Sequence, residues 1–178
     1  MRFHFALAAL AATAAFATPA FAQSAPVTSS DSIEARALLI QPATIQRVDD
    51  LSFGTIIATP SASGNVTIDA NTGLRVVGAG LTGSVSDQGQ RGRFIGNGVP
   101  LSSVNLTAAF PNVLVNTADN SAGVTFSNGS LDLASATGSR IIGPTGVFYV
   151  GVGGTITIAT NQMPGLYTGT VTLTADFQ

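Results

Sequence analysis

The chain has 178 residues and a net charge of −2 at pH 7, with seven arginines, no lysine, no cysteine and one histidine. This balance excludes a broad basic surface for nucleic acid or anionic lipid, and it leaves packing and backbone hydrogen bonds to hold the fold without disulfides. Glu34 is the only glutamate, whereas Thr, Ser, Gly, Val and Asn are abundant, so the composition favours an all-β protein.

The N-terminus has the pattern of a secretory signal peptide. Arg2 supplies a positive charge, Phe5–Ala17 is a short apolar run, and Ala20-Phe21-Ala22 is a small-residue cleavage site. Removal of residues 1–22 would leave 178 − 22 = 156 residues, with six arginines against nine acids and a net charge of −3. The apolar run is too short to span a membrane. We therefore expect an exported chain that does not insert directly into the membrane.

The segment after the cleavage site is polar and rich in Ser and Thr. We expect residues 23–34 to form a flexible extension and residues 35–178 to form one β-sandwich domain. The end of the extension already has strand character, continuing to about residue 40, because Ile33, Ala35, Ala37 and Leu39 share one parity before Pro42.

The middle of the chain predicts many short strands between turn residues. In the segment 51–57, Leu51, Phe53, Thr55 and Ile57 would share one face of a strong strand. Segments 147–150 and 155–159 would form a hairpin across Gly151–Gly154. The other expected strands are 44–48, 66–68, 74–77, 93–95, 104–110, 113–116, 124–126 and 131–133, with turns at 69–73 and 127–129 and a glycine-rich loop at 78–92. This spacing is typical of an immunoglobulin-like Greek-key β-sandwich.

The C-terminal segment has the most regular alternation in the chain. Its apolar parity is Tyr167, Gly169, Val171, Leu173, Ala175 and Phe177, and mostly Thr occupies the other parity. The pattern predicts one continuous strand from Tyr167 to Phe177 with a single apolar face. Only Gln178 follows in the sequence, so we expect that another molecule covers this strand's free edge.

The sequence predicts a protein without catalysis. His4 lies in the predicted signal peptide, and a mature chain without His, Cys or Lys cannot form a Ser-His-Asp triad, a Schiff base or a Cys/His zinc site. Gly78–Gly83 matches a dinucleotide motif, but no helix can start after it. Asp69-x-Asn71-x-Gly73 resembles the start of a calcium loop, but no Glu closes it. We expect no catalytic residue, cofactor or metal.

Four short stretches of the sequence carry a resemblance to known families. Gly165 is fourteenth from the C-terminus and Phe177 is penultimate, which resembles the C-terminal signature of chaperone–usher fimbrial subunits, where Tyr is commoner than Phe. Leu51-Ser52-Phe53-Gly54-Thr55-Ile56 is similar to an early L-x-F-G-x-I strand of such pilins. Together with 150–156 and 167–169, it gives essentially the whole mature chain a closer resemblance to DUF4402, a bacterial family of pilin-like domains.

The resemblance implies an incomplete sandwich that is completed by a donor strand. It implies a periplasmic chaperone, an outer-membrane usher and assembly with itself or other pilin subunits at a Gram-negative cell surface. The groove and chaperone contacts would be Gly165, Tyr167, Gly169, Val171, Leu173, Ala175 and Phe177; the donor residues would be Ile33, Ala35, Ala37 and Leu39. The disulfide of many pilins is absent.

Another interpretation remains open from the residues alone. Both segments could be ordinary strands of a self-complete, exported binding module, for example a carbohydrate-binding or adhesin domain. In that case the scattered Phe and Tyr residues would include a platform on which sugars stack.

Overall fold

The computed structural model describes residues 31–34, 36–37, 42–133 and 135–178, and the chain divides into two units, 1–37 and 38–178. In the first unit the described residues have no regular secondary structure and are exposed. Its Arg36 and Glu34 side chains form an exposed ion pair of 2.7 Å. The predicted donor residues Ala35 and Leu39 lie outside the described residues.

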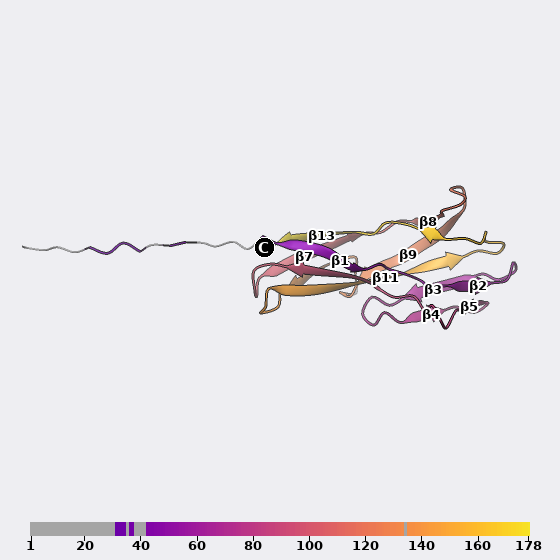
Figure 1. The fold of residues 1–178 in the computed structure, drawn as a ribbon, viewed down its shortest axis with the longest axis horizontal. Helices are drawn as coiled ribbons and strands as arrows, with labels where there is room; N and C mark the ends of the chain where they lie inside the picture. Colours follow the sequence, from indigo (N-terminus) through magenta and orange to yellow (C-terminus); the bar gives the residue numbers. More distant parts are fainter. Residues whose placement is uncertain (1–30, 35, 38–41, 134) are drawn as a thin grey trace, which may run out of the picture. The chain divides into compact units, whose positions relative to one another are not determined.

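The second unit is an all-β sandwich of antiparallel strands, without a helix in the part that the structure describes, as the sequence predicts (Figure 1). The larger sheet has the order β1-β6-β11-β9-β8-β12, with β3 and β4 added beside β11; the other two sheets are β10-β7-β13 and β2-β5. The strands are β1 Thr44–Asp49, β2 Ile56–Ala58, β3 Gly64–Ile68, β4 Arg75–Val77, β5 Leu81–Gly83, β6 Gly92–Asn97, β7 Ser103–Ala109, β8 Val113–Asn116, β9 Gly123–Leu131, β10 Thr137–Ile141, β11 Val147–Ile158, β12 Tyr167–Thr168 and β13 Thr172–Phe177.

The central strand β11 corrects a sequence prediction. The expected hairpin across Gly151–Gly154 is wrong, because these glycines lie inside one strand of 12 residues. Along one edge β11 pairs first with β6 and then with β3, and along the other edge it pairs with β9. A Cβ on Gly154 would meet the ring of Phe126. The glycine here permits close packing rather than a turn.

Strand β9 corrects a second prediction. Residues 127–129 do not form a turn between two strands, because they lie within the nine-residue strand β9. Asn128 has a positive φ of 51°, and the register with β11 shifts where Gly153 pairs with Ser130 and Thr155 pairs with Ser127. The turn-type residues therefore form a β-bulge inside a continuous ladder.

The segment 51–57 is also not the predicted strand. Only its last two residues belong to β2, and Ser52 makes an isolated bridge to Gln90. Gly54 has φ 69°, and a Cβ there would lie 2.5 Å from both the Asp87 oxygen and the Gly89 nitrogen. This left-handed residue changes the parity, so Phe53 is buried but Ile57 is 59% exposed.

Two clusters of buried side chains form the core, and β11 contributes to both. The first cluster is Val104, Leu106, Ala108, Leu131, Ile142, Phe148, Val150 and Val152. The second is Phe53, Val66, Ile68, Val124, Phe126, Ile156 and Ile158. The sheet β10-β7-β13 contributes only to the first cluster, whereas β2, β4 and β5 pack partly buried apolar residues against the second. The two clusters therefore have different covering strands.

Candidate strand-binding groove

The C-terminal segment passes from one sheet to the other. Tyr167 and Thr168 form β12 and pair with β8, whereas Thr172–Phe177 form β13 and pair with β7. The prediction of one continuous strand is therefore wrong. The predicted alternation is confirmed except at Gly169: Tyr167, Val171, Leu173, Ala175 and Phe177 are partly buried, whereas Gly169 and the residues of the other parity are exposed.

The β13 part of this segment packs on the protein's own core. Leu173, Ala175 and Phe177 contact the first core cluster, and the rings of Phe177 and Phe148 meet edge to face with 6.0 Å between centroids. Leu173, Ala175 and Phe177 do not line the groove described below. They are partly buried by the chain itself.

The other predicted residues of this segment line a groove of about 970 Å³. One wall comes from Arg47, from residues 49–56 and from Ala58. The facing wall is residues 162–171, which include the predicted residues Gly165, Tyr167, Gly169 and Val171. Between the walls lie Gly92, Phe94, Pro111, Leu114, Val124, Phe126, Val152, Ile156 and Ile158.

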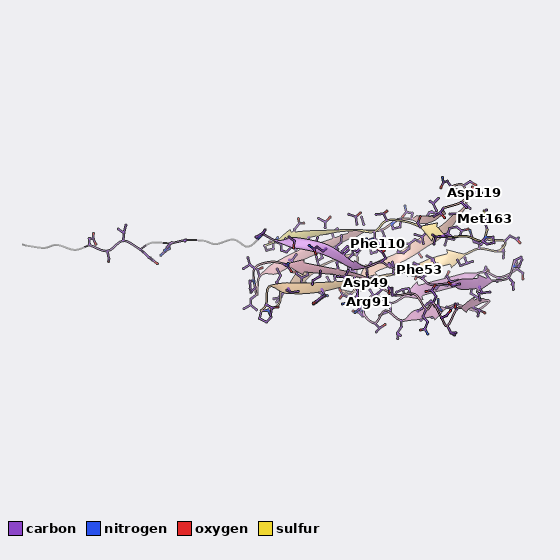
Figure 2. The ribbon with its side chains drawn as sticks, in the orientation of Figure 1. Asp49, Phe53, Arg91, Phe110, Asp119 and Met163 are labelled. Atoms are coloured by element: carbon purple, nitrogen blue, oxygen red, sulfur yellow. The ribbon has the colours of Figure 1, made fainter. Side chains whose placement is uncertain are left out.

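The two walls run in opposite directions along the groove. At one end Leu51 and Val171 both pack against the first core cluster. At the other end the Asn161 amide donates to the Pro60 carbonyl at 2.7 Å. In Figure 2, Phe53, on the first wall, lies near the middle of the β body, and Met163, on the second wall, lies nearer one end. Each wall contributes ten lining residues, so the groove is suited to an extended segment rather than a compact ligand.

The floor of the groove consists of core side chains. Val124, Phe126 and Ile156 are each at most 5% exposed, yet they line the groove. Phe126 stacks on Phe110 at 5.7 Å and meets Phe53 edge to face at 6.1 Å. An occupant of the groove would therefore contact the second core cluster directly.

The second wall has unpaired backbone at the edge of the groove. In the part of the chain that the structure describes, Gly169, Thr170 and Val171 form no backbone–backbone hydrogen bond, although the strands on both sides of them are paired. Unpaired extended backbone of this kind is a template for another strand.

A buried asparagine anchors the start of this wall. Asn116 is fully buried, and its side-chain oxygen accepts from the amides of Ala118 at 2.8 Å and Asp119 at 3.2 Å. Its amide nitrogen donates to the Pro164 carbonyl at 3.4 Å, just before Gly165, whose φ is 149°. Asn116 thereby links β8 to the wall.

Charged groups line one part of the groove rim. Arg47 pairs with Asp50 at 2.7 Å at an exposed position, and Asp49 pairs at 3.4 Å with the partly exposed Arg93, which lies outside the groove. The Thr55 hydroxyl donates to Asp87 at 2.8 Å and is the main reason that the pKa of Asp87 is below its usual value. Such exposed pairs contribute little to stability, so they leave the apolar floor as the main feature of the groove.

The predicted donor residues that the structure describes, Ile33 and Ala37, belong to the other unit. Ile33 is 94% exposed and Ala37 is also exposed.

The sequence reasoning missed the wall formed by residues 47–56, because it assigned Leu51–Ile57 to an ordinary strand. The L-x-F-G-x-I pattern was the available signal, since its glycine is the residue that turns this segment.

A second, smaller hollow lies outside the groove. It has a volume of about 270 Å³ and is lined by Arg91, Arg93, Asp132, Tyr149, Val150 and Gly151. Asp132 is paired with Arg140 at 2.8 Å, and Tyr149 is 53% exposed.

No group of three or more His, Cys, Asp or Glu side chains in the described residues could hold a metal ion. Among the same residues, no helix is long and apolar enough to cross a membrane.

Comparison with known proteins gives a family. No curated protein matches the chain. The family model "Domain of unknown function (DUF4402)" matches residues 43–177, which include every strand from β1 to β13 in full. Since this match covers well over half of the sequence, the chain belongs to the DUF4402 family.

Proposed function

We propose that this protein is a non-catalytic structural subunit of a surface fimbria that assembles by donor-strand exchange through a chaperone–usher-type pathway. The observation that carries this proposal is the groove between residues 47–58 and 162–171, whose floor is formed by core side chains. Strand addition requires a free main-chain edge for hydrogen bonds and pockets for alternate side chains. The unpaired backbone of Gly169–Val171 supplies such an edge.

The expected gain from filling the groove is large. A donor strand places every second side chain toward the floor, and each large apolar side chain contributes roughly 1.5–3 kcal/mol when fully buried. Ile33 and Leu39 are large, whereas Ala35 and Ala37 between them are small. The gross gain is an upper bound, because ordering the donor costs conformational entropy.

Chain length favours donation to a second copy. Only residues 40–43 separate Leu39 from β1, and the groove starts at Arg47 and extends to Ala58. If the donor turned back along β1 of its own chain, Leu39 would lie across from Thr44, and Ile33 would reach only about as far as Asp50, since paired strands advance at the same rise per residue. The end of the groove near Ala58 would then receive the polar residues before Ile33. A donor from a second copy is not joined to this β1, so its apolar residues can reach the whole groove.

The pathway follows from these requirements. An exported subunit with an open apolar groove would need a periplasmic chaperone strand until the next subunit arrives, and an outer-membrane usher for the exchange. Residues 1–22 would direct export, and the assembled fimbria would lie at the cell surface.

The test compares two neighbouring leucines in the mature chain, residues 23–178. Leu39→Asp places a charge on the face predicted to enter the groove, and Leu38→Asp places the same charge on the opposite face. The proposal predicts polymers by size-exclusion chromatography for the parent and Leu38→Asp, and predominantly monomers for Leu39→Asp. Equal assembly of both variants, or a parent that is only monomeric, would contradict the proposal.

The 270 Å³ hollow favours a second candidate, an exported carbohydrate-binding module. It combines the exposed ring of Tyr149 with arginine and carboxylate groups, which is a common composition of sugar sites. Saturation-transfer NMR with a panel of monosaccharides would test it. Binding that disappears in Tyr149→Ala and persists in Tyr167→Ala would support this candidate, and no binding by the parent would exclude it for the sugars used.

A further inference from the structure

We propose that Arg75 is a positioning residue for the groove, and that it holds the wall around Gly54 in a strand-receptive form before any strand arrives. This inference rests on the proposed function, because it concerns how the same groove accepts its donor. Arg75 lies on β4 and does not itself line the groove.

The guanidinium of Arg75 contacts four backbone carbonyls. Its Nη1 donates to the carbonyl oxygens of Phe53 at 3.1 Å, Thr55 at 3.3 Å and Asp87 at 2.9 Å. Its Nη2 donates to the carbonyl oxygen of Ser84 at 2.6 Å. Phe53, Thr55 and Asp87 all line the groove. A single side chain therefore gathers backbone from the first wall and from the loop behind it.

The local backbone explains why an arginine is needed. The left-handed turn at Gly54 takes this segment out of a regular ladder, so among the described residues the Phe53 carbonyl accepts no backbone amide, and the Thr55 carbonyl accepts only the Ser84 amide at 2.9 Å. Arginine offers five donors in a planar fork and stays charged at every relevant pH. Beyond Arg75, this part of the wall is held by the Ser52–Gln90 bridge and by bonds between Thr55 and the backbone of Ser84 and Asp87.

Arg75 also ties the wall to the centre of the fold. It belongs to β4, which pairs with β3, which in turn pairs with β11. An empty apolar groove tends to close on itself, because closure removes apolar surface from water. The tie keeps Phe53–Thr55 against the rest of the β body and so holds the first wall apart from residues 162–171. Holding a binding surface in its bound form lowers the cost of association.

The chain contains a matched control. Arg91 also donates to backbone carbonyls, those of Ala70 at 3.0 Å and Asn71, and fastens the loop between β3 and β4. Neither Arg91 nor this loop lines the groove. Substitution of Arg91 therefore removes a comparable set of hydrogen bonds to backbone carbonyls without affecting the first wall of the groove.

The experiment measures donor binding to the mature Leu39→Asp chain, whose own donor is disabled, with a synthetic peptide of residues 31–41 as the probe. Arg75→Gln, Arg75→Lys and Arg91→Gln are added in turn, and surface plasmon resonance gives association and dissociation rates. We expect Arg75→Gln to weaken peptide binding at least about tenfold, mainly by slower association. The affinity of Arg75→Lys should lie between those of Arg75→Gln and the parent. The affinity of Arg91→Gln should stay within about twofold of the parent's.

The outcomes separate this inference from the proposed function. If the Leu39→Asp parent does not bind the peptide, the proposed function fails and the role of Arg75 fails with it. If the parent binds and Arg75→Gln binds equally well, or no worse than Arg91→Gln, only the positioning role is wrong. Should Arg75→Gln not fold, Arg75→Lys decides: affinity and association rate equal to the parent's would overturn the inference, and a reduced association rate would support it.

Discussion

The Asn161 amide donates to the Pro60 carbonyl at 2.7 Å, and this bond joins the two walls of the groove at one end. From that point the walls separate, and the second core cluster lies between them. The groove therefore opens between the two walls directly onto core side chains, rather than being a shallow depression on the surface of the sandwich. Substitutions that affect the walls, the floor or the core should have distinguishable consequences.

Phe177 is predicted to stabilise the subunit itself rather than to bind a partner. Its ring packs on Phe148 and on the first core cluster, away from the groove. Phe177→Ala should lower the free energy of unfolding by about 3 kcal/mol, because it leaves a cavity in the core. Urea unfolding of the Leu39→Asp chain measures this. Gln178→Ala is the control, and a loss below about 1 kcal/mol for Phe177→Ala would contradict the assignment.

Gly54→Ala is predicted to destabilise the first wall more than a comparable glycine substitution elsewhere. Both Gly54 and Gly73 have positive φ, but a Cβ on Gly54 would lie 2.5 Å from backbone atoms, whereas on Gly73 its nearest neighbour is the Arg91 side chain at 3.4 Å. Strain from φ alone costs about 1 kcal/mol or more, and the clash at Gly54 adds to it. In thermal unfolding, the melting temperature of Gly54→Ala should be well below that of Gly73→Ala. Equal melting temperatures would show that the wall adjusts freely.

Asn116 is predicted to hold the second wall in place. Replacing it with Ala leaves the amides of Ala118 and Asp119 without their acceptor and releases Pro164. A typical hydrogen bond contributes about 0.5–1.5 kcal/mol, so losing these partly buried bonds should lower the free energy of unfolding of Asn116→Ala by roughly 1–3 kcal/mol. Amide exchange of residues 165–168 should also become faster. Unchanged exchange there would contradict the role of Asn116 as the anchor.

Acid should weaken the β3–β4 turn through Asp69. The Thr72 backbone amide and hydroxyl donate to this carboxylate and lower its pKa from the ordinary value of 3.8. Because the folded-state pKa lies below the unfolded one, the contribution to stability is present above 3.8 and is lost as the pH falls below it. Asp69→Asn should flatten the loss of melting temperature between about pH 5 and pH 2.5. An unchanged pH profile would contradict this account.

Local sequence patterns predicted the fold class well because alternation and turn residues are local signals. The parity of Val171–Phe177 and the bounds of β1 and β8 follow from such signals. The passage of the C-terminal segment between sheets was not predictable in this way, because both strands keep the same parity across Gly169–Val171.

Long-range contacts explain the other differences. Gly151–Gly154 indicate a turn when read locally, but close approach of the neighbouring strand and of the Phe126 ring is what requires them. Strand β10 escaped prediction because Thr137-Gly138-Ser139-Arg140-Ile141 is mostly polar. The first wall depends on Arg75, which is distant in sequence from Gly54. The second wall could be predicted in part, at Gly165, Tyr167, Gly169 and Val171, but the first wall could not.

The most direct test of the open groove is amide hydrogen exchange of the mature Leu39→Asp chain, with and without the peptide of residues 31–41. Among the residues that the structure describes, Gly169, Thr170 and Val171 have no backbone partner, so their amides should exchange rapidly in the empty chain. The account predicts that the peptide protects this segment while β7 and β13 stay as protected as before. Strong protection of Gly169–Val171 without peptide, or no change when the peptide is added, would contradict it.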